Sequence, residues 1–232
     1  MGKIDDKHLN WGLAHSGTDQ MHNFEKRRDR YNAFASFENP LVNLSFEMEL
    51  PDFRPYCKAH QLPPFHFFLF AVLTSINKID NFMYRVHEGA VIRIDDFLAS
   101  YTVINQDGNL NFARFPMSED LQRFVARSLA AKREAEASGP LINTLAGQSP
   151  LDQRKNFFVT CMPWLKLAAI EHPIFEHKSY DIPSLAWGKF GDAPGGAMTV
   201  PFAVQAHHGF VDGYHVHLLA EAIKARVAAL MA

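Results

Sequence analysis

The chain has few cysteines, no long apolar run and no excess of charge of either sign. Cys57 and Cys161 are its two cysteines, which excludes a disulfide framework and any Cys-x-x-Cys zinc or redox motif. Its 23 Lys and Arg nearly balance its 25 Asp and Glu, so a nucleic-acid partner is not expected. The apolar run over 67–73 is too short to span a bilayer, and the N-terminus does not resemble a signal peptide. These absences predict a cytoplasmic protein with no membrane partner.

The hydrophobic pattern predicts one α+β domain. Residues 1–24 are polar and aperiodic, so we expect a loosely ordered N-terminal arm followed by a single domain over 25–232. Alternating side chains and turn residues predict strands over 41–49, 82–86, 90–94, 99–104, 110–115, 156–162, 185–190 and 198–206. Helices are expected over 51–60, 63–79, 118–137 and 214–231, and a loop over 140–155. This order favours a two-layer sandwich in which helices pack on a mixed, mostly antiparallel sheet.

Histidine is concentrated in one place, since four of the 12 histidines lie between His207 and His217. A metal site is not expected there, because His215 and His217 would lie on different faces of a helix. His207, His215 and His217 are each more simply interpreted as interior or surface histidines. His208, with Asp212 four residues later in a tight turn, is typical of a general base. An imidazole titrates near pH 6.5 and can exchange a proton with a hydroxyl or thiol.

The His-His-x-x-x-Asp-Gly pattern of residues 207–213 resembles the signature of the chloramphenicol acetyltransferase family. Three further segments match that family in order and spacing, so the resemblance covers about residues 25–230: Arg27-x-x-x-Tyr31-x-x-Phe34, Phe157-x-x-Thr160-x-x-Pro163-Trp164 and Gly188-Lys189-Phe190. It implies the fold of that family and an acyltransferase that uses acetyl-CoA. The acetyl group would pass directly to the hydroxyl of a small, partly apolar acceptor, chloramphenicol or a related alcohol. Antibiotic resistance is the implied biological role.

The resemblance also implies a role for particular residues. His208 would be the general base, and Asp212 would pair with Arg27, for which Arg28 is the alternative. Thr160 stands where the family has an oxyanion-binding Ser, although it could also be a plain strand residue. The remaining implied contacts are Lys189 and Phe190 with CoA, and Phe34 and Phe112 with the acceptor. Alternation along the strand places Cys161 on the opposite face from Thr160, which favours packing over an acyl-cysteine route.

The resemblance further implies a homotrimer with active sites at the subunit interfaces. His208 would come from one subunit and much of the acceptor pocket from its neighbour, with Phe34 a candidate for the neighbour's share. The chain departs from the family in lacking a lysine near 62–65, where a CoA phosphate would be held, and in having Ala186 in place of a Thr. These departures keep open a non-catalytic or weakly catalytic homologue that binds CoA or another small ligand. A dihydrolipoamide acyltransferase is a further alternative, which the residues around His208 fit poorly.

Overall fold

A mixed five-stranded sheet forms the centre of the protein in the computed structural model, which describes residues 23–142, 146–174, 180–193 and 197–232. The strand order is β1-β9-β7-β6, and β8 also pairs with β9. The strands are β1 (Leu41–Leu50), β6 (Phe158–Cys161), β7 (Ser184–Trp187), β8 (Gly191–Asp192) and β9 (Met198–His207). β1 and β9 are antiparallel along their whole length, whereas β6 and β7 are parallel.

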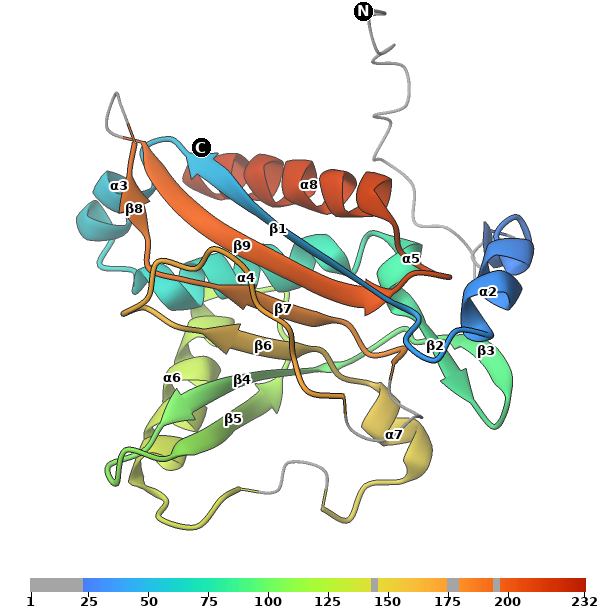
Figure 1. Ribbon diagram of the computed structural model, residues 1–232. Coiled ribbons are helices and arrows are strands. Elements are labelled where there is room, and N and C mark those ends of the chain that lie inside the picture. Colours follow the sequence, from blue (N-terminus) through green and yellow to red (C-terminus); the bar gives the residue numbers. More distant parts are fainter. Residues whose placement is uncertain (1–22, 143–145, 175–179, 194–196) are drawn as a thin grey trace, which may run out of the picture.

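Two antiparallel hairpins complete the β structure. They are β2 (Tyr84–His87) with β3 (Ala90–Arg93), and β4 (Leu98–Ile104) with β5 (Leu110–Pro116). A parallel bridge between Leu98 and Asn156 joins the second hairpin to the residues that precede β6. The hairpin therefore continues the sheet beyond β6, as Figure 1 shows.

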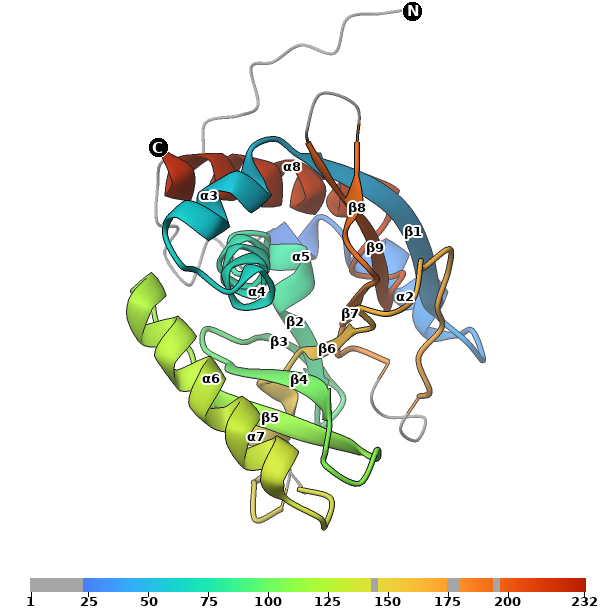
Figure 2. The ribbon, with the colours of Figure 1, turned by 90° about the vertical axis from the view of Figure 1, so that its left-hand side faces the viewer.

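Four of the described helices lie on one face of the sheet (Figure 2). They are α3 (Phe53–Ala59), α4 (Pro64–Ile76), α6 (Leu121–Ala137) and α8 (Gly213–Met231). α4 packs against both α6 and α8 and is buried without interruption from His66 to Ile76. This position explains why its sequence is apolar all round. Three short helices remain, namely α2 (Arg28–Ala35), α5 (Asp80–Met83) and α7 (Pro150–Arg154), and α2 lies at the end of the sheet where β9 ends (Figure 1).

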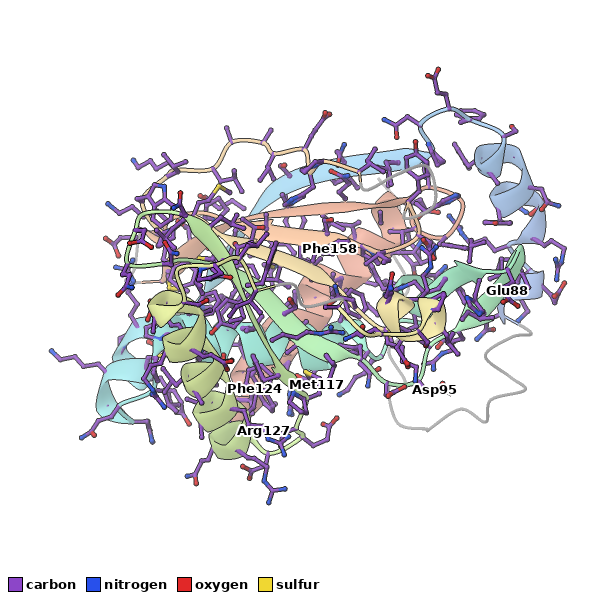
Figure 3. All side chains as sticks on the ribbon, turned by 90° about the horizontal axis from the view of Figure 1, so that it is seen from below. Glu88, Asp95, Met117, Phe124, Arg127 and Phe158 are labelled. Atoms are coloured by element: carbon purple, nitrogen blue, oxygen red, sulfur yellow. The ribbon has the colours of Figure 1, made fainter. Side chains whose placement is uncertain are left out.

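Phenylalanine supplies much of the core between the sheet and the helices. Phe124 of α6 packs edge-on against Phe70 and Phe115, with ring centroids 5.2 and 5.1 Å away. Figure 3 labels Phe124 on its helix and Phe158 on β6. Phe157 is buried against Phe97 and Arg85, whereas Phe158, the next residue, is only partly covered. The strands thus have one face in the core and one face away from the helices.

The predicted α+β sandwich is confirmed, with local differences. The strand expected over 82–86 begins inside α5, and the loop expected over 140–155 contains α7, which Ser149 caps by accepting from the Asp152 backbone N–H at 3.1 Å. The strand expected over 185–190 ends at Trp187, because the chain passes so close to residue 165 that a Cβ at Gly188 would lie 2.7 Å from the Leu165 carbonyl oxygen.

The predicted N-terminal arm over 1–24 lies almost wholly outside the described residues. Phe24, which that prediction places in the arm, is fully buried against Tyr31, Tyr84 and Phe210. The domain therefore starts at or before Phe24 in the described chain. None of the helices in the described ranges combines the length and apolarity needed to cross a membrane.

Candidate active site

His208 lies in the turn that follows β9, at the end of the sheet nearest α2. Its backbone N–H donates to the Pro40 carbonyl at 2.7 Å, which fixes the turn to the residue before β1. Its ring Nδ1 lies 3.1 Å from the Val211 carbonyl oxygen. Because a carbonyl only accepts hydrogen bonds, this contact places the proton on Nδ1 and leaves a lone pair on Nε2. His208 is only half-buried, so the arrangement suits a general base that reaches a bound hydroxyl.

Arg27 holds this turn from the side of α2. Its guanidinium lies 2.9 Å from the Asp212 carboxylate, and its Nε donates to the Gly209 carbonyl at 2.9 Å. A longer contact of 3.3 Å reaches the His208 carbonyl. Arg28, the alternative partner, instead pairs with Glu25 on the exposed side of the helix. Arg27 therefore contacts the backbone of His208, the candidate base, and that of Gly209, which follows it.

Asp212 caps α8 while it pairs with Arg27. Its carboxylate accepts from the Tyr214 backbone N–H at 3.0 Å and lies 2.8 Å from His215 Nδ1. Burial alone would raise the pKa of Asp212, but the charges of His215 and Arg27 outweigh burial and lower it. Burial also lowers the pKa of His215, and the Asp212 backbone N–H donates to His215 Nδ1 at 3.2 Å, which completes a capping box at the start of α8. The carboxylate stays ionised and has donors on both sides.

His207 is a packing residue, which fits its interpretation from the sequence as an interior or surface histidine. Its ring stacks on Tyr31 at 5.5 Å, and its Nδ1 accepts from the Gly209 backbone N–H at 3.0 Å. Burial lowers the pKa of His207 to about 4, so it is neutral at physiological pH. Gly209 is needed here because a Cβ would lie 2.8 Å from both the His207 ring and the Tyr31 Cα. α2 can therefore approach the turn closely enough for Arg27 to reach it.

Phe34 lies directly against the candidate base. Its ring centroid is 4.1 Å from that of His208, at an angle of 30°. The suggestion that Phe34 belongs to the neighbouring subunit's share of the pocket is wrong for this contact, because both residues belong to the same chain. The two rings are adjacent because α2 is fixed to the turn by Arg27 and Tyr31.

Thr160 and Phe112 lie elsewhere on the sheet. Both are partly exposed on the face away from the helices, since Val159 and Ala113 beside them are buried. Phe112 pairs with Thr102 across the β4–β5 hairpin, and the bridge from Leu98 to Asn156 places Thr102 level with Thr160. These two predicted site residues therefore share one row across neighbouring strands.

Lys189 and Phe190 follow β7, near the end of β6 that carries Thr160. The Lys189 backbone N–H donates to the Leu165 carbonyl at 2.7 Å, and its side chain is exposed. Phe190 packs into the core against Phe53 and Phe68 with ring centroids 6.3 and 5.9 Å away. Its packing against the core leaves only part of the ring accessible to a ligand.

The structure does not bring Thr160 and His208 together within one chain. Thr160 pairs with Ala186, which pairs with Ala203, and His208 lies five residues beyond Ala203. At about 3.3 Å per residue and 4.8 Å per strand, the two residues are roughly 20 Å apart. The predicted residues therefore form two groups. We call His208, Arg27, Asp212 and Phe34 the base group, and Thr160, Phe112, Lys189 and Phe190 the sheet group.

Both cysteines are poor nucleophiles. Burial raises the pKa of Cys57 to about 11 and that of Cys161 to about 12, so both thiols stay protonated near neutral pH. Cys161 therefore offers no thiolate for an acyl intermediate. In the described ranges, no group of three or more His, Cys, Asp or Glu side chains is arranged to hold a metal ion.

The sequence interpretation missed Arg54 and His215. Arg54 donates to the Phe190 carbonyl at 2.8 Å and pairs with Asp192 at 2.6 Å, so it lies beside Lys189 although 135 positions separate them in the chain. No local pattern reveals such a contact. His215 was interpreted as an ordinary interior or surface histidine. It follows Asp212 by three residues, however, and this is the position whose side chain bonds back to the N-cap residue in a capping box. The spacing between Asp212 and His215 could therefore have indicated this role from the sequence.

Comparison with known proteins identifies the family. The family model for chloramphenicol acetyltransferase matches residues 19–224. The chain belongs to the chloramphenicol acetyltransferase family. It is thereby an acyltransferase, as the sequence predicts. The described base group and sheet group both lie within the matched range.

Curated relatives and solved structures show how distant the similarity is. A chloramphenicol acetyltransferase of Proteus mirabilis is 21% identical over 200 residues, covering 85% of this chain and 88% of that one. Chloramphenicol acetyltransferase 3 of Escherichia coli is 22% identical, covering 64% and 67%. A solved chloramphenicol acetyltransferase is 25% identical, covers 88% of this chain and 97% of its own, and has a TM-score of 0.77. A dihydrolipoamide acetyltransferase of Azotobacter vinelandii, 14% identical with a TM-score of 0.66 and coverage of 99% and 97%, shares the fold.

Proposed function

We propose that the protein transfers an acetyl group from acetyl-CoA to the hydroxyl of a small, partly apolar acceptor, chloramphenicol or a related alcohol. The observation that carries this proposal is the His208 ring. Its Nδ1 proton is directed to the Val211 carbonyl, and its Nε2 lone pair is left for a substrate. Arg27 and Asp212 hold the same turn rigidly. Family membership supports the reaction class.

In the proposed reaction His208 acts first as a base and then as an acid. Nε2 takes the hydroxyl proton while the acceptor oxygen attacks the thioester carbonyl. The tetrahedral intermediate carries its negative charge on the former carbonyl oxygen, and the Thr160 hydroxyl is the proposed donor to that oxyanion. The C–S bond then breaks, and the CoA sulfur takes the proton from Nε2. An acetyl ester and free CoA result, with no acyl-enzyme.

We propose that the working site forms between two copies of the chain. About 20 Å separates Thr160 from His208 in one chain, which is too far for both to act on one carbonyl. A neighbouring copy that places its sheet group against the base group would supply the missing donor. This need supports the homotrimer that the family resemblance implies, with three equivalent interfaces.

For CoA, we propose that Arg54 shares the role of the lysine that the chain lacks near 62–65. Arg54 contacts the backbone of Phe190, next to Lys189, and its side chain is 44% exposed. A guanidinium and an ammonium at this place suit a phosphate group. Arg54→Gln should raise the KM for acetyl-CoA and leave the KM for acetyl-dephospho-CoA, which lacks the 3′-phosphate, unchanged. Equal increases for both would overturn this assignment.

The test of the function is acetyl-CoA-dependent release of free thiol with chloramphenicol and a panel of small alcohols. His208→Gln should abolish release, whereas His217→Gln, which alters an exposed histidine on α8, should not. Comparable turnover by the wild type and His208→Gln would refute the assignment of the base. Saturable CoA binding with no thiol release for any acceptor would instead support a non-catalytic homologue. Light scattering should give the mass of a trimer.

A further inference from the structure

A basic cavity lies behind the base group. It is open to solvent, has a volume of about 490 Å³, and is lined by residues before and within α2, by residues 78–81 up to the start of α5, and by the start of α8. This size falls within the range of about 300–1,000 Å³ that is usual for small-molecule sites. The charged side chains that line it are Lys26, Arg27, Arg30, Lys78 and Asp80, with His215 beside them.

Charge in this cavity is not balanced. Arg27 pairs with Asp212 at 2.9 Å, and Asp80 pairs with Arg93 at 3.1 Å. Arg30 is also paired, with Asp29. Lys26 and Lys78 have no carboxylate within ion-pair distance among the described residues. Two exposed ammonium groups with no ion-pair partner among the described residues therefore line one cavity, where both can attract an anion.

His215 adds a further polar group to the lining of the cavity. His215 directs Nδ1 toward Asp212 at 2.8 Å, so Nε2 lies on the opposite edge of the ring. Arg27 belongs both to the cavity lining and to the base group. A ligand in the cavity would therefore contact two residues that fix the His208 turn.

We propose that this cavity binds a dianionic phosphate, free or as the monoester of a small molecule, and that its occupation weakens the hold of Arg27 on Asp212. A phosphate monoester carries a charge of about −1.5 to −2 at pH 7, which matches the two unpaired lysines. A single carboxylate would leave one of them uncompensated. Phosphate oxygens also compete directly with a carboxylate for a guanidinium. Binding itself does not depend on the proposed function, whereas the effect on turnover rests on it.

Equilibrium dialysis with radiolabelled inorganic phosphate tests binding in the full chain, at an ionic strength held constant with sodium chloride. Wild type should bind one phosphate per chain saturably, and Lys26→Gln and Lys78→Gln should each weaken binding about tenfold. The matched controls are the single variants Lys132→Gln and Lys224→Gln, because each lysine lies in an exposed helical ion pair and each variant also loses one charge. No saturable binding by the wild type, or equal weakening in the controls, would overturn the site.

Two further arms separate this site from the CoA site and test the coupling. Unlabelled CoA should leave phosphate bound, and displacement by CoA at concentrations near its KM would assign the phosphate to CoA instead. Phosphate should lower kcat without changing the KM for acetyl-CoA, and Lys26→Gln with Lys78→Gln should abolish this inhibition. If phosphate binds saturably but turnover does not change, the proposed effect of binding on turnover is refuted and the binding site is retained. Absence of turnover altogether would count against the proposed function and leave the binding result standing.

Discussion

Replacing Arg27 by methionine should separate the role of the base group from that of the general fold. Methionine keeps much of the aliphatic length but removes every donor. The change deletes the ion pair with Asp212 at 2.9 Å and the hydrogen bond to the Gly209 carbonyl at 2.9 Å, together with the longer contact to the His208 carbonyl. All three contacts converge on the turn between β9 and α8.

The size of the expected loss in unfolding free energy follows from how buried the deleted contacts are. The Arg27 side chain is 16% exposed and the Asp212 side chain 33% exposed, so solvent screens the ion pair and it contributes about 1 kcal/mol. The bond to the buried Gly209 carbonyl contributes about 1.5 kcal/mol, and the 3.3 Å contact adds less. We therefore expect a loss of about 3 kcal/mol in the free energy of unfolding. If this loss appears as misplacement of His208, kcat should fall about a hundredfold.

Thiol-release kinetics and urea unfolding of the same preparations measure both effects. Arg28→Met is the matched control, because Arg28 is the next residue but contacts exposed Glu25 and the Phe24 ring instead of the turn. It should change the unfolding free energy by about 1 kcal/mol or less and leave kcat unchanged. Arg27→Lys should be intermediate, since an ammonium can keep the ion pair but cannot reach all three oxygens as a planar fork does.

Two results would refute this reasoning. If Arg27→Met and Arg28→Met lower kcat equally, the contacts to the turn have no special role. If Arg27→Met loses stability but keeps full kcat, the ion pair supports folding and does not position His208.

Other consequences concern thiols, pH and the acceptor. Burial raises the pKa of Cys57 to about 11 and that of Cys161 to about 12, so iodoacetamide at pH 8 should alkylate neither until denaturant is added, as mass spectrometry would show. Burial lowers the pKa of His66 and His207 to about 4 in the folded protein. Below pH 6.5 these two histidines are therefore protonated in the unfolded state but still neutral in the folded state. Urea titrations should therefore show full stability above pH 6.5 and a loss of up to about 1.4 kcal/mol per pH unit per histidine down to pH 4, and His66→Leu should remove about half of this slope. Phe34→Ala removes the ring 4.1 Å from His208 and should raise the acceptor KM up to about tenfold, with little change in the KM for acetyl-CoA.

The parts of the fold with a strong local signal could be predicted from the sequence. The alternation of 198–206 gives β9 to within one residue, and Pro63-Pro64 gives the start of α4 to within one residue, although that helix ends at Ile76 and not at the expected residue 79. The loop over 140–155 could not be resolved in this way, because α7 is a five-residue helix whose signal is one Ser cap and one Pro. The strand expected over 82–86 exists as β2 (Tyr84–His87), but its expected start was two residues too early. Its first residues are apolar because α5 is buried, and burial alone does not distinguish a helical turn from a strand.

The site could be predicted where its residues are close in sequence. The turn from His207 to Asp212 could be predicted, because the spacing of its residues in the sequence is itself a recognisable pattern. The contact of Arg27 with that turn needed the family pattern, since the two segments are more than 180 positions apart. The clustering of Lys26 and Lys78 beside His215 had no sequence signal at all, because each is an ordinary exposed residue on a different element.

The roughly 20 Å between Thr160 and His208 makes a quantitative prediction for mixed oligomers. His208→Gln and Thr160→Val each disable every site of a pure trimer if one copy supplies the base and its neighbour supplies the oxyanion donor. In a random one-to-one mixture, about a quarter of the interfaces join an intact His208 to an intact Thr160, because each partner is the required variant half of the time. Co-expression of the two variants with different affinity tags, followed by isolation of doubly tagged trimers, should therefore restore thiol release to a substantial fraction of wild type. Mixed trimers no more active than the two pure variants would show that each chain completes its own site, and the distance within one chain would then have to close by a movement of the sheet.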